Sequence, residues 1–228
     1  MLLKPQPISS LYGAGRPVYP AQEFFTEFSG GDENPLSEGS VWLNGLDDGT
    51  DWKNFQIVNG RGCGGDFSSS SPPPYNDSCA LVKSSRYACP NDQFAEMEVY
   101  VSGGYGPSGT HELGLFVRAA MSSGTMRGYE AYLNIAGNFG IVEWNGPVSS
   151  FAYLSTTNHN GGPSAPSNGM VIRLEAQGTA IRYYQNGVLK ASASDATWTS
   201  GQCGLQSYVV SGGTLGNYAA NNFRCGGL

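Results

Sequence analysis

The chain has 228 residues, a formal net charge of −6 and only 13% charged side chains, with 33 glycines and 13 prolines. An acidic chain without a basic stripe cannot neutralise a row of phosphates, so we expect no nucleic-acid partner. No run approaches the roughly 18 consecutive apolar residues of a transmembrane helix, so we expect no membrane insertion. The length is common for a single all-β domain, and the glycines and prolines supply many turns.

The first 22 residues form a proline-rich arm with neither strand nor helix periodicity. They lack the apolar core of roughly 7–15 residues that a secretory signal needs, so we expect no such signal. Ordering each backbone residue costs about 1–2 kcal/mol, so an ordered arm needs a large contact. We expect it to lie extended across a neighbouring subunit, while packing on its own domain stays open. Its apolar anchors are Leu2, Leu3, Ile8, Leu11, Tyr12, Val18 and Tyr19.

The arm is followed by a segment, Glu23–Leu36, that begins with alternating side chains and predicts a first strand. We expect this strand to pair with the last strand of the chain, near Asn222–Arg224. Further on, an acidic turn brings Asp47, Asp48 and Asp51 within five residues. Their carboxylates are candidate calcium ligands, but the regular spacing of a calcium loop is missing, so a solvated turn is the simpler interpretation.

The middle of the chain alternates between strand patterns and polar loops. The loops are Asp66–Asp77, rich in serine and proline, and Thr156–Ser167. Strands are predicted at Gln93–Ser102, His111–Met121, Gly128–Ile135, Asn138–Trp144 and Phe151–Ser155.

The clearest pattern in the chain is a three-stranded antiparallel meander. Alternating runs occupy Met170–Ala176, Ala180–Gln185 and Val188–Ser192. The last two runs are joined by Asn186-Gly187, the dipeptide that suits a type I′ hairpin turn because both residues tolerate positive φ. We expect the inward-facing side chains to be Ile172, Leu174, Ile181 and Tyr183.

The five cysteines, Cys63, Cys79, Cys89, Cys203 and Cys225, show no local metal-binding spacing. The two histidines, His111 and His159, are far apart, so we expect no metal site of the usual zinc spacing. An odd number of cysteines leaves at least one without a disulfide, and the connectivity cannot be deduced. We expect partly buried thiols, with a Cys63–Cys79 bridge as the alternative.

Several motifs resemble the laminin-G-like branch of the concanavalin A-like sandwiches. They are the VIRLE strand and the I-x-x-Y-x-N-G-V hairpin within Gly169–Asp195, GLFVRA at Gly114–Ala119, RGYEAYLN at Arg127–Asn134 and the closing NNFR at Asn221–Arg224. The resemblance implies an all-β, antiparallel two-sheet jelly-roll sandwich. We therefore expect an extended arm over residues 1–22 and a single concanavalin A/laminin G-like β-sandwich over residues 23–228.

One strand face emerges as a candidate glycan-binding surface. Alternation places Glu130, Tyr132 and Asn134 on one face of their strand, with Arg118 on the same face of the preceding strand. A polar, aromatic-bearing face is where relatives of this fold often hold sugars. The alternative is a cross-strand ion pair between Arg118 and Glu130, which needs no ligand.

We expect no enzymatic activity. The acids Glu112, Glu130 and Glu143 stand singly on separate strands, whereas glycosidases of this fold resemble one another in carrying alternating acids on one strand. No Ser/His/Asp or Cys/His arrangement can be assembled either.

The resemblance and the arm together suggest a non-enzymatic structural or adhesion protein of a bacteriophage virion, such as a capsid decoration or a tail or fibre protein. Its partners would be other virion proteins or identical subunits, and a cell-surface glycan as well. A stand-alone carbohydrate-binding module outside the cell is the alternative, and a glycoside hydrolase of the same fold is a further one. No cofactor is expected, with calcium at the acidic turn left open.

Overall fold

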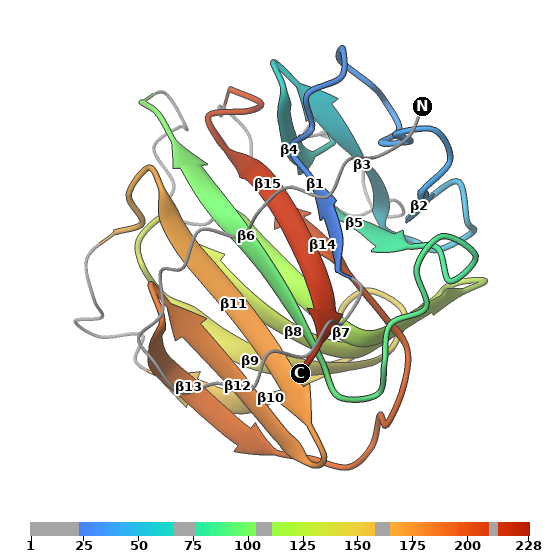
Figure 1. Ribbon diagram of the computed structural model, residues 1–228, viewed down its shortest axis with the longest axis vertical. Coiled ribbons are helices and arrows are strands. Elements are labelled where there is room, and N and C mark those ends of the chain that lie inside the picture. Colours follow the sequence, from blue (N-terminus) through green and yellow to red (C-terminus); the bar gives the residue numbers. More distant parts are fainter. Residues whose placement is uncertain (1–22, 66–75, 104–110, 158–164, 210–213) are drawn as a thin grey trace.

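The computed structural model describes residues 23–65, 76–103, 111–157, 165–209 and 214–228. These residues form fifteen strands and no helix, so none of them lies in a helix that could cross a membrane (Figure 1). The predicted arm and its seven anchors lie outside the described residues, as do His159 and most of the two predicted polar loops.

The fifteen strands are numbered in chain order. They are β1 (Phe24–Thr26), β2 (Trp42–Asn44), β3 (Lys53–Val58), β4 (Arg61–Gly64), β5 (Asp77–Val82), β6 (Gln93–Val101), β7 (Glu112–Ser122), β8 (Thr125–Asn134), β9 (Phe139–Gly146), β10 (Phe151–Thr157), β11 (Met170–Gln177), β12 (Ala180–Gln185), β13 (Val188–Ser194), β14 (Gln202–Tyr208) and β15 (Tyr218–Gly227).

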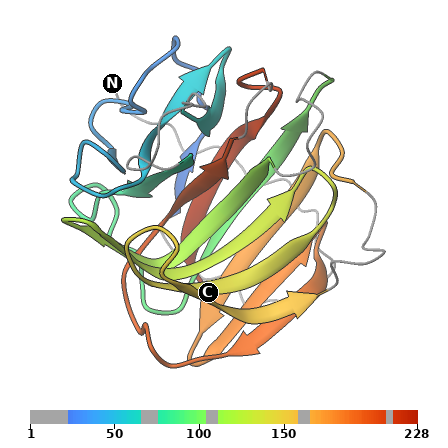
Figure 2. The same cartoon turned by 180° about the vertical axis from the view of Figure 1, so that it is seen from behind.

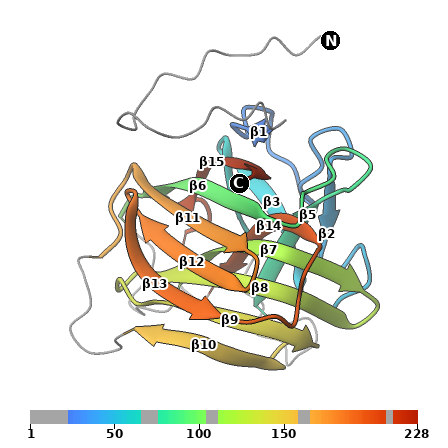
Figure 3. The ribbon, with the colours of Figure 1, turned by 60° about the horizontal axis from the view of Figure 1, so that its bottom comes forward.

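The strands form two layers. The front sheet has β1 beside β15 and continues in the order β15-β6-β11-β12-β13, while the back sheet runs β5-β14-β7-β8-β9-β10 with β2 beside β5. The front sheet faces the viewer in Figure 1 and the back sheet faces the viewer in Figure 2, and the tilted view of Figure 3 separates the two layers. Strand β3 joins them at one edge, because it pairs with β4 and, in parallel, with β5.

The space between the two sheets holds the main apolar core. The four side chains of the meander that were predicted to face inward, Ile172, Leu174, Ile181 and Tyr183, are fully buried there. On the back sheet the alternate residues of β8 complete the core. Burial of apolar surface on both inner faces is the main term that stabilises such a sandwich. The predicted all-β jelly-roll sandwich is confirmed.

The predicted meander is observed as β11, β12 and β13, with antiparallel pairing throughout. The turn between β12 and β13 has positive φ at both central residues, 49° at Asn186 and 75° at Gly187, as the type I′ prediction requires.

The predicted pairing of the first and last strands is also observed. Phe24 lies opposite Cys225 and Thr26 lies opposite Phe223. Four strands were not predicted from the sequence, namely β2, β3, β4 and β14. The short β4 reads RGCG and β14 contains a glycine and two glutamines, so neither shows the apolar alternation that marks a strand.

Candidate functional site

The back sheet buries side chains on its outer face as well as its inner one. Along β7 and β8, Leu115 and Ala131 point to the core between the sheets, whereas Phe116 and Tyr132 belong to a second apolar cluster. Trp52 packs on this outer cluster, with its ring 5.8 Å from Phe116. Part of the outer face is therefore covered, and the uncovered part forms a pocket.

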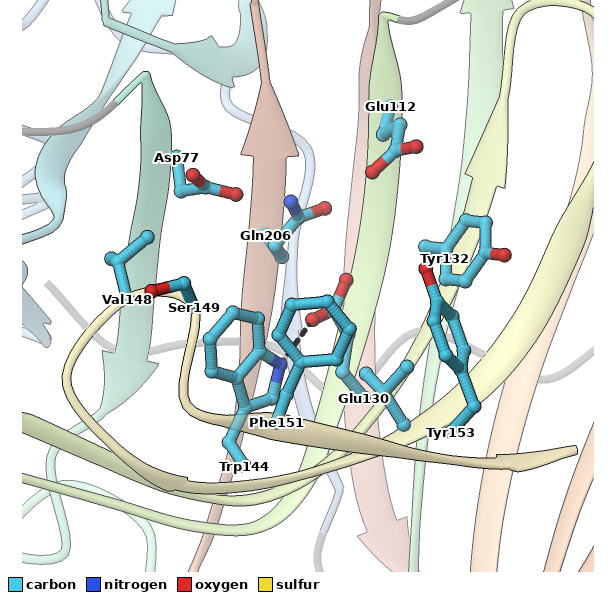
Figure 4. Close-up of a pocket in the computed structure, with 11 residues that line it drawn as sticks. Asp77, Glu112, Glu130, Tyr132, Trp144, Val148, Ser149, Phe151, Tyr153 and Gln206 are labelled. Carbon is cyan, nitrogen blue, oxygen red and sulfur yellow. Dashed lines mark hydrogen bonds between the residues drawn. The ribbon is translucent and has the colours of Figure 1, made fainter.

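The pocket has a volume of about 230 Å³ and is built by strands β5, β14, β7, β8, β9 and β10 (Figure 4). Three carboxyl side chains and a glutamine lie on one part of its wall, and aromatic side chains on another. The lining residues are Asp77, Glu112, Glu130, Tyr132, Val142, Trp144, Val148, Ser149, Phe151, Tyr153 and Gln206. No basic side chain is among them.

Burial raises the pKa values of the three carboxyl groups of the pocket. The pKa of Glu130 is raised well above its usual range, although its carboxylate accepts a 2.5 Å hydrogen bond from Trp144 Nε1. Burial also raises the pKa of Glu112 to about 8 and that of Asp77 to about 6. The negative charge of Asp77 adds to the shift of Glu112. At neutral pH Glu112 is therefore mostly protonated and Asp77 mostly ionised.

Gln206 stands on β14, between the strands that carry Asp77 and Glu112. Its side chain is 1% exposed, and its Oε1 has no hydrogen-bond partner among the described residues. A buried acceptor without a donor costs about 1–3 kcal/mol, so this oxygen is ready to receive a hydrogen bond from a ligand in the pocket.

Aromatic rings form the opposite rim. Phe151 and Tyr153, at the start of β10, are 41% and 52% exposed. Their rings meet edge to face at 5.3 Å, and Phe151 lies 4.9 Å from Trp144. Tyr132 completes the row, 6.5 Å from Tyr153. Exposed aromatic rings beside polar groups are unusual on a soluble surface and are typical of binding sites.

The structure brings together two of the four residues predicted to bind a glycan. Glu130 and Tyr132 line the pocket, and their strand has the predicted faces. Asn134 does not line it, because its Oδ1 accepts hydrogen bonds from the backbone of Ala136 and Asn138 in the β8–β9 turn.

Arg118 was predicted on the same face as Glu130, and this placement is wrong. A β-bulge interrupts the β7–β8 register after Val117, and Arg118 has a φ of 50°. The bulge turns the guanidinium to the other side, where it donates to the carbonyls of Asn91, Gly178 and Trp198. The alternative of an Arg118–Glu130 ion pair is wrong for the same reason. Arg118 is paired instead with Asp92 at 3.3 Å.

The three acids of the predicted calcium turn make separate hydrogen bonds. Asp48 accepts from the backbone of Asn44, Asp47 accepts from the Asn54 side chain, and Asp51 accepts from the backbone of Val148 at 2.9 Å. Asp51 thereby fixes the loop that carries two pocket residues. Calcium binding at this turn stays a prediction.

Most of the pocket could not be identified from local sequence. Glu112 was recognised as a single acid, but Asp77, Gln206 and the aromatic pair of β10 come from strands far apart in the chain. One local signal was present, because Phe151 and Tyr153 alternate with Ala152 and Leu154 at the start of β10. Glu143, the third acid considered, does not line the pocket.

No protein-family model matches this chain, and no curated protein matches it at a significant level. Similar solved structures do exist. The carbohydrate recognition domain of Emp46p is 10% identical, with 82% of this chain and 88% of that chain covered and a TM-score of 0.54. An endo-β-1,3-glucanase from Pyrococcus furiosus is 12% identical, with 90% and 93% covered and a TM-score of 0.51. A carbohydrate-binding module, CBM66 from Bacillus subtilis, is 16% identical, with 84% and 95% covered and a TM-score of 0.50.

The expectation that the chain is not an enzyme is contradicted by these similarities. Several similar structures are glycanases, including an endo-β-galactosidase from Clostridium perfringens as well as the glucanase. The expectation relied on acids standing singly on separate strands, yet the curvature and order of those strands place Asp77, Glu112 and Glu130 in one pocket. The narrower laminin-G-like resemblance stays a prediction. At the level of fold, this chain has the concanavalin A-like β-sandwich that lectin, carbohydrate-binding and glycanase domains share.

Proposed function

We propose that the chain binds a carbohydrate in the pocket on the outer face of its back sheet. The observation that carries the proposal is the combination of an exposed aromatic rim with buried, uncompensated polar groups in one cavity. Sugars have apolar C–H faces, which can pack on the aromatic rim, and many hydroxyl groups, which can form hydrogen bonds with the buried polar groups. The similar carbohydrate-binding structures support the same class of ligand.

The two walls of the pocket would contact different parts of a sugar. A sugar ring can pack on Tyr153 and Phe151, whose rings are half exposed. On the opposite wall the protonated Glu112 donates a hydrogen bond, while Gln206 Oε1 and the ionised Asp77 accept from hydroxyl groups.

The size of the pocket limits what it can hold. Its volume of about 230 Å³ is below the roughly 300–1,000 Å³ that is usual for small-molecule pockets. We therefore expect recognition of a single ring or of one end of a glycan, with the rest of the chain outside.

A glycan array followed by calorimetric titration of the best ligand tests this proposal. Tyr153→Ala should reduce binding at least tenfold, because the variant removes the more exposed ring of the rim. Phe25→Ala is the matched control, since Phe25 is 53% exposed but stands on β1, which pairs with β15 in the front sheet. No glycan bound by the wild type, or equal losses in both variants, would contradict the proposal.

A second candidate function is glycoside hydrolysis, and one observation favours it. The pocket holds carboxyl groups with separated pKa values, about 6 for Asp77 and about 8 for Glu112. Such a pair can act as general base and general acid at neutral pH. Both residues lie opposite Tyr208 on β14, so their Cα atoms are two strand spacings, about 9–10 Å, apart on one face.

Hydrolysis can be separated from binding by two variants. The substrates to test are β-1,3-glucan and a β-galactoside glycan that carries GlcNAcα1-4Gal, as the names of two similar structures suggest. Incubation with the right substrate should release reducing ends if the candidate holds. Asp77→Asn and Glu112→Gln should then each reduce the rate of release at least a hundredfold. Glu143→Gln changes a residue outside the pocket and should leave this rate unchanged. Binding without release of reducing ends would leave carbohydrate binding alone.

A virion location also stays a proposal, supported by the acidic, glycine-rich sandwich and by the proline-rich sequence of residues 1–22. Deleting residues 1–22 should prevent incorporation into particles and leave the melting temperature of the domain nearly unchanged. A large drop in melting temperature would show instead that residues 1–22 pack on the sandwich of their own chain.

A further inference from the structure

Three cysteines that are distant in sequence meet at one end of the sandwich. Cys203 is on β14 in the back sheet, Cys225 is on β15 in the front sheet, and Cys89 is in the connection between β5 and β6. We call these three residues the thiol cluster. Their sulfur atoms all lie within 4.8 Å of one another. All three are thiols in the structure.

The thiol cluster is buried on one side and accessible on the other. Cys203 and Cys225 are 0% exposed, whereas Cys89 is partly exposed. Cys89 is therefore the residue of the cluster that solvent reaches. This is the arrangement of a binding site and differs from that of Cys79, which is fully buried in the outer apolar cluster.

The position of Cys89 is fixed by hydrogen bonds that start next to Cys203. Gln202 Nε2 donates to the carbonyls of Val82 and Tyr87, both at 2.8 Å, so one side chain of β14 holds the connection that carries Cys89. The backbone N–H of Cys203 also donates to Cys89 Sγ at 3.3 Å. Outer groups that orient the ligands are a usual feature of metal sites.

A metal ion that binds the three sulfur atoms would displace their thiol protons, so the cysteines would bind it as thiolates.

We propose that the thiol cluster is a binding site for a soft, thiophilic metal ion of the class of Cu(I) and Zn(II). Sulfur ligands select this class of ion over magnesium, calcium and manganese. Three sulfurs at about 2.3 Å from one ion lie about 4 Å from each other, close to the separations that are already present. Cu(I) needs no further ligand, whereas Zn(II) takes a fourth, which a water molecule at the accessible Cys89 side supplies.

The consequence for the fold is a cross-link between the layers. The ion would join β14 of the back sheet, β15 of the front sheet and the β5–β6 connection. The inference is independent of carbohydrate binding, because no residue of the thiol cluster lines the pocket.

The test is a titration of the reduced full-length chain with Zn(II), with Cd(II) as its spectroscopic substitute, and under anaerobic conditions with Cu(I). We expect one ion per chain, an ultraviolet thiolate-to-metal charge-transfer band and a rise in Tm of several degrees. The Zn(II) and Cu(I) arms identify which ion binds more tightly in competition with chelators of known affinity.

Cys89→Ser should abolish the band and the rise in Tm, and it is the safest variant because Cys89 is the least buried of the three. Cys63→Ser is the matched control and should keep both. If Cys225→Ser fails to fold, Cys89→Ser alone still decides. The proposal is overturned if Cys63→Ser loses metal binding to the same extent as Cys89→Ser, or if the wild type binds neither ion tightly. Formation of a disulfide within the cluster in place of metal binding under mild oxidation also overturns it.

Discussion

The two faces of the back sheet are buried to a similar degree and differ in chemistry. On the inner face, Leu115 and Ala131 are fully buried among apolar side chains. On the outer face, Glu130 is 3% exposed and Gln206 is 1% exposed, beside aromatic rings. Apolar side chains have no hydrogen bonds to satisfy when they are buried. A buried acid without a basic partner reduces the stability of the fold, and hydrogen bonds from a ligand would offset this cost. This difference is the reason why we propose the outer face, and not the inner face, as the binding site.

Leu174→Ala should give the largest loss of stability, because Leu174 is 0% exposed in the core between the sheets. We expect the free energy of unfolding to fall by about 2–5 kcal/mol, measured by urea denaturation. Leu189→Ala is the control, since Leu189 is 50% exposed and should change stability by less than about 0.5 kcal/mol. Equal effects would mean that the register of the meander is wrong.

Glu112→Gln should change how stability depends on pH. The pKa of this carboxyl rises from 4.5 to about 8 in the folded chain, so its favourable contribution is complete below about pH 4.5 and is lost as the pH rises to about 8. The free energy of unfolding of the variant should therefore equal that of the wild type near pH 4 and exceed it above pH 8, by up to about 5 kcal/mol. A difference in stability between Glu112→Gln and the wild type that does not depend on pH would contradict the burial of the Glu112 charge.

Gly187→Ala should destabilise the meander by about 1 kcal/mol, because an alanine at a φ of 75° is strained. Gly31→Ala is the control, since a methyl group there meets nothing within 4 Å and its φ lies outside the left-handed region. Unfolding curves that coincide for the wild type and Gly187→Ala would argue against the I′ turn.

Tyr153→Ala should have the smallest effect on stability, within about 0.5 kcal/mol, because Tyr153 is 52% exposed. The same change should cause a large loss of glycan binding. A loss of stability comparable to that of Leu174→Ala would instead make Tyr153 part of the packing.

The sequence predicted the parts of the fold that depend on local patterns. The alternation of residues 170–192 and the Asn186-Gly187 turn give the meander with its register, and the alternation of β8 correctly separates Glu130 and Tyr132 from the inward-facing residues. The prediction from alternation failed at Arg118. A β-bulge there adds unpaired residues between two regular stretches of β7, so the side chains no longer alternate between the two faces of the sheet.

The site could be predicted only in part, because it is assembled by tertiary structure. Asp77 and Glu112 are 35 positions apart but meet through β14, a strand whose own sequence shows little alternation. The thiol cluster has the same origin. Cys89, Cys203 and Cys225 show no metal-binding spacing, and only the pairing of β14 and β15 with their neighbours brings the sulfurs together.

The most direct test of the pocket uses the indole N–H signals of the tryptophans in a nitrogen–proton NMR spectrum during titration with the best glycan from the array. Trp144 Nε1 donates to Glu130 in the pocket, whereas Trp42 Nε1 donates to Glu38 at 2.8 Å, away from it. We predict that the Trp144 signal shifts in a saturable manner and that the Trp42 signal stays in place. A glycan that binds while the Trp144 signal remains unmoved would contradict the assignment of this pocket as the carbohydrate site.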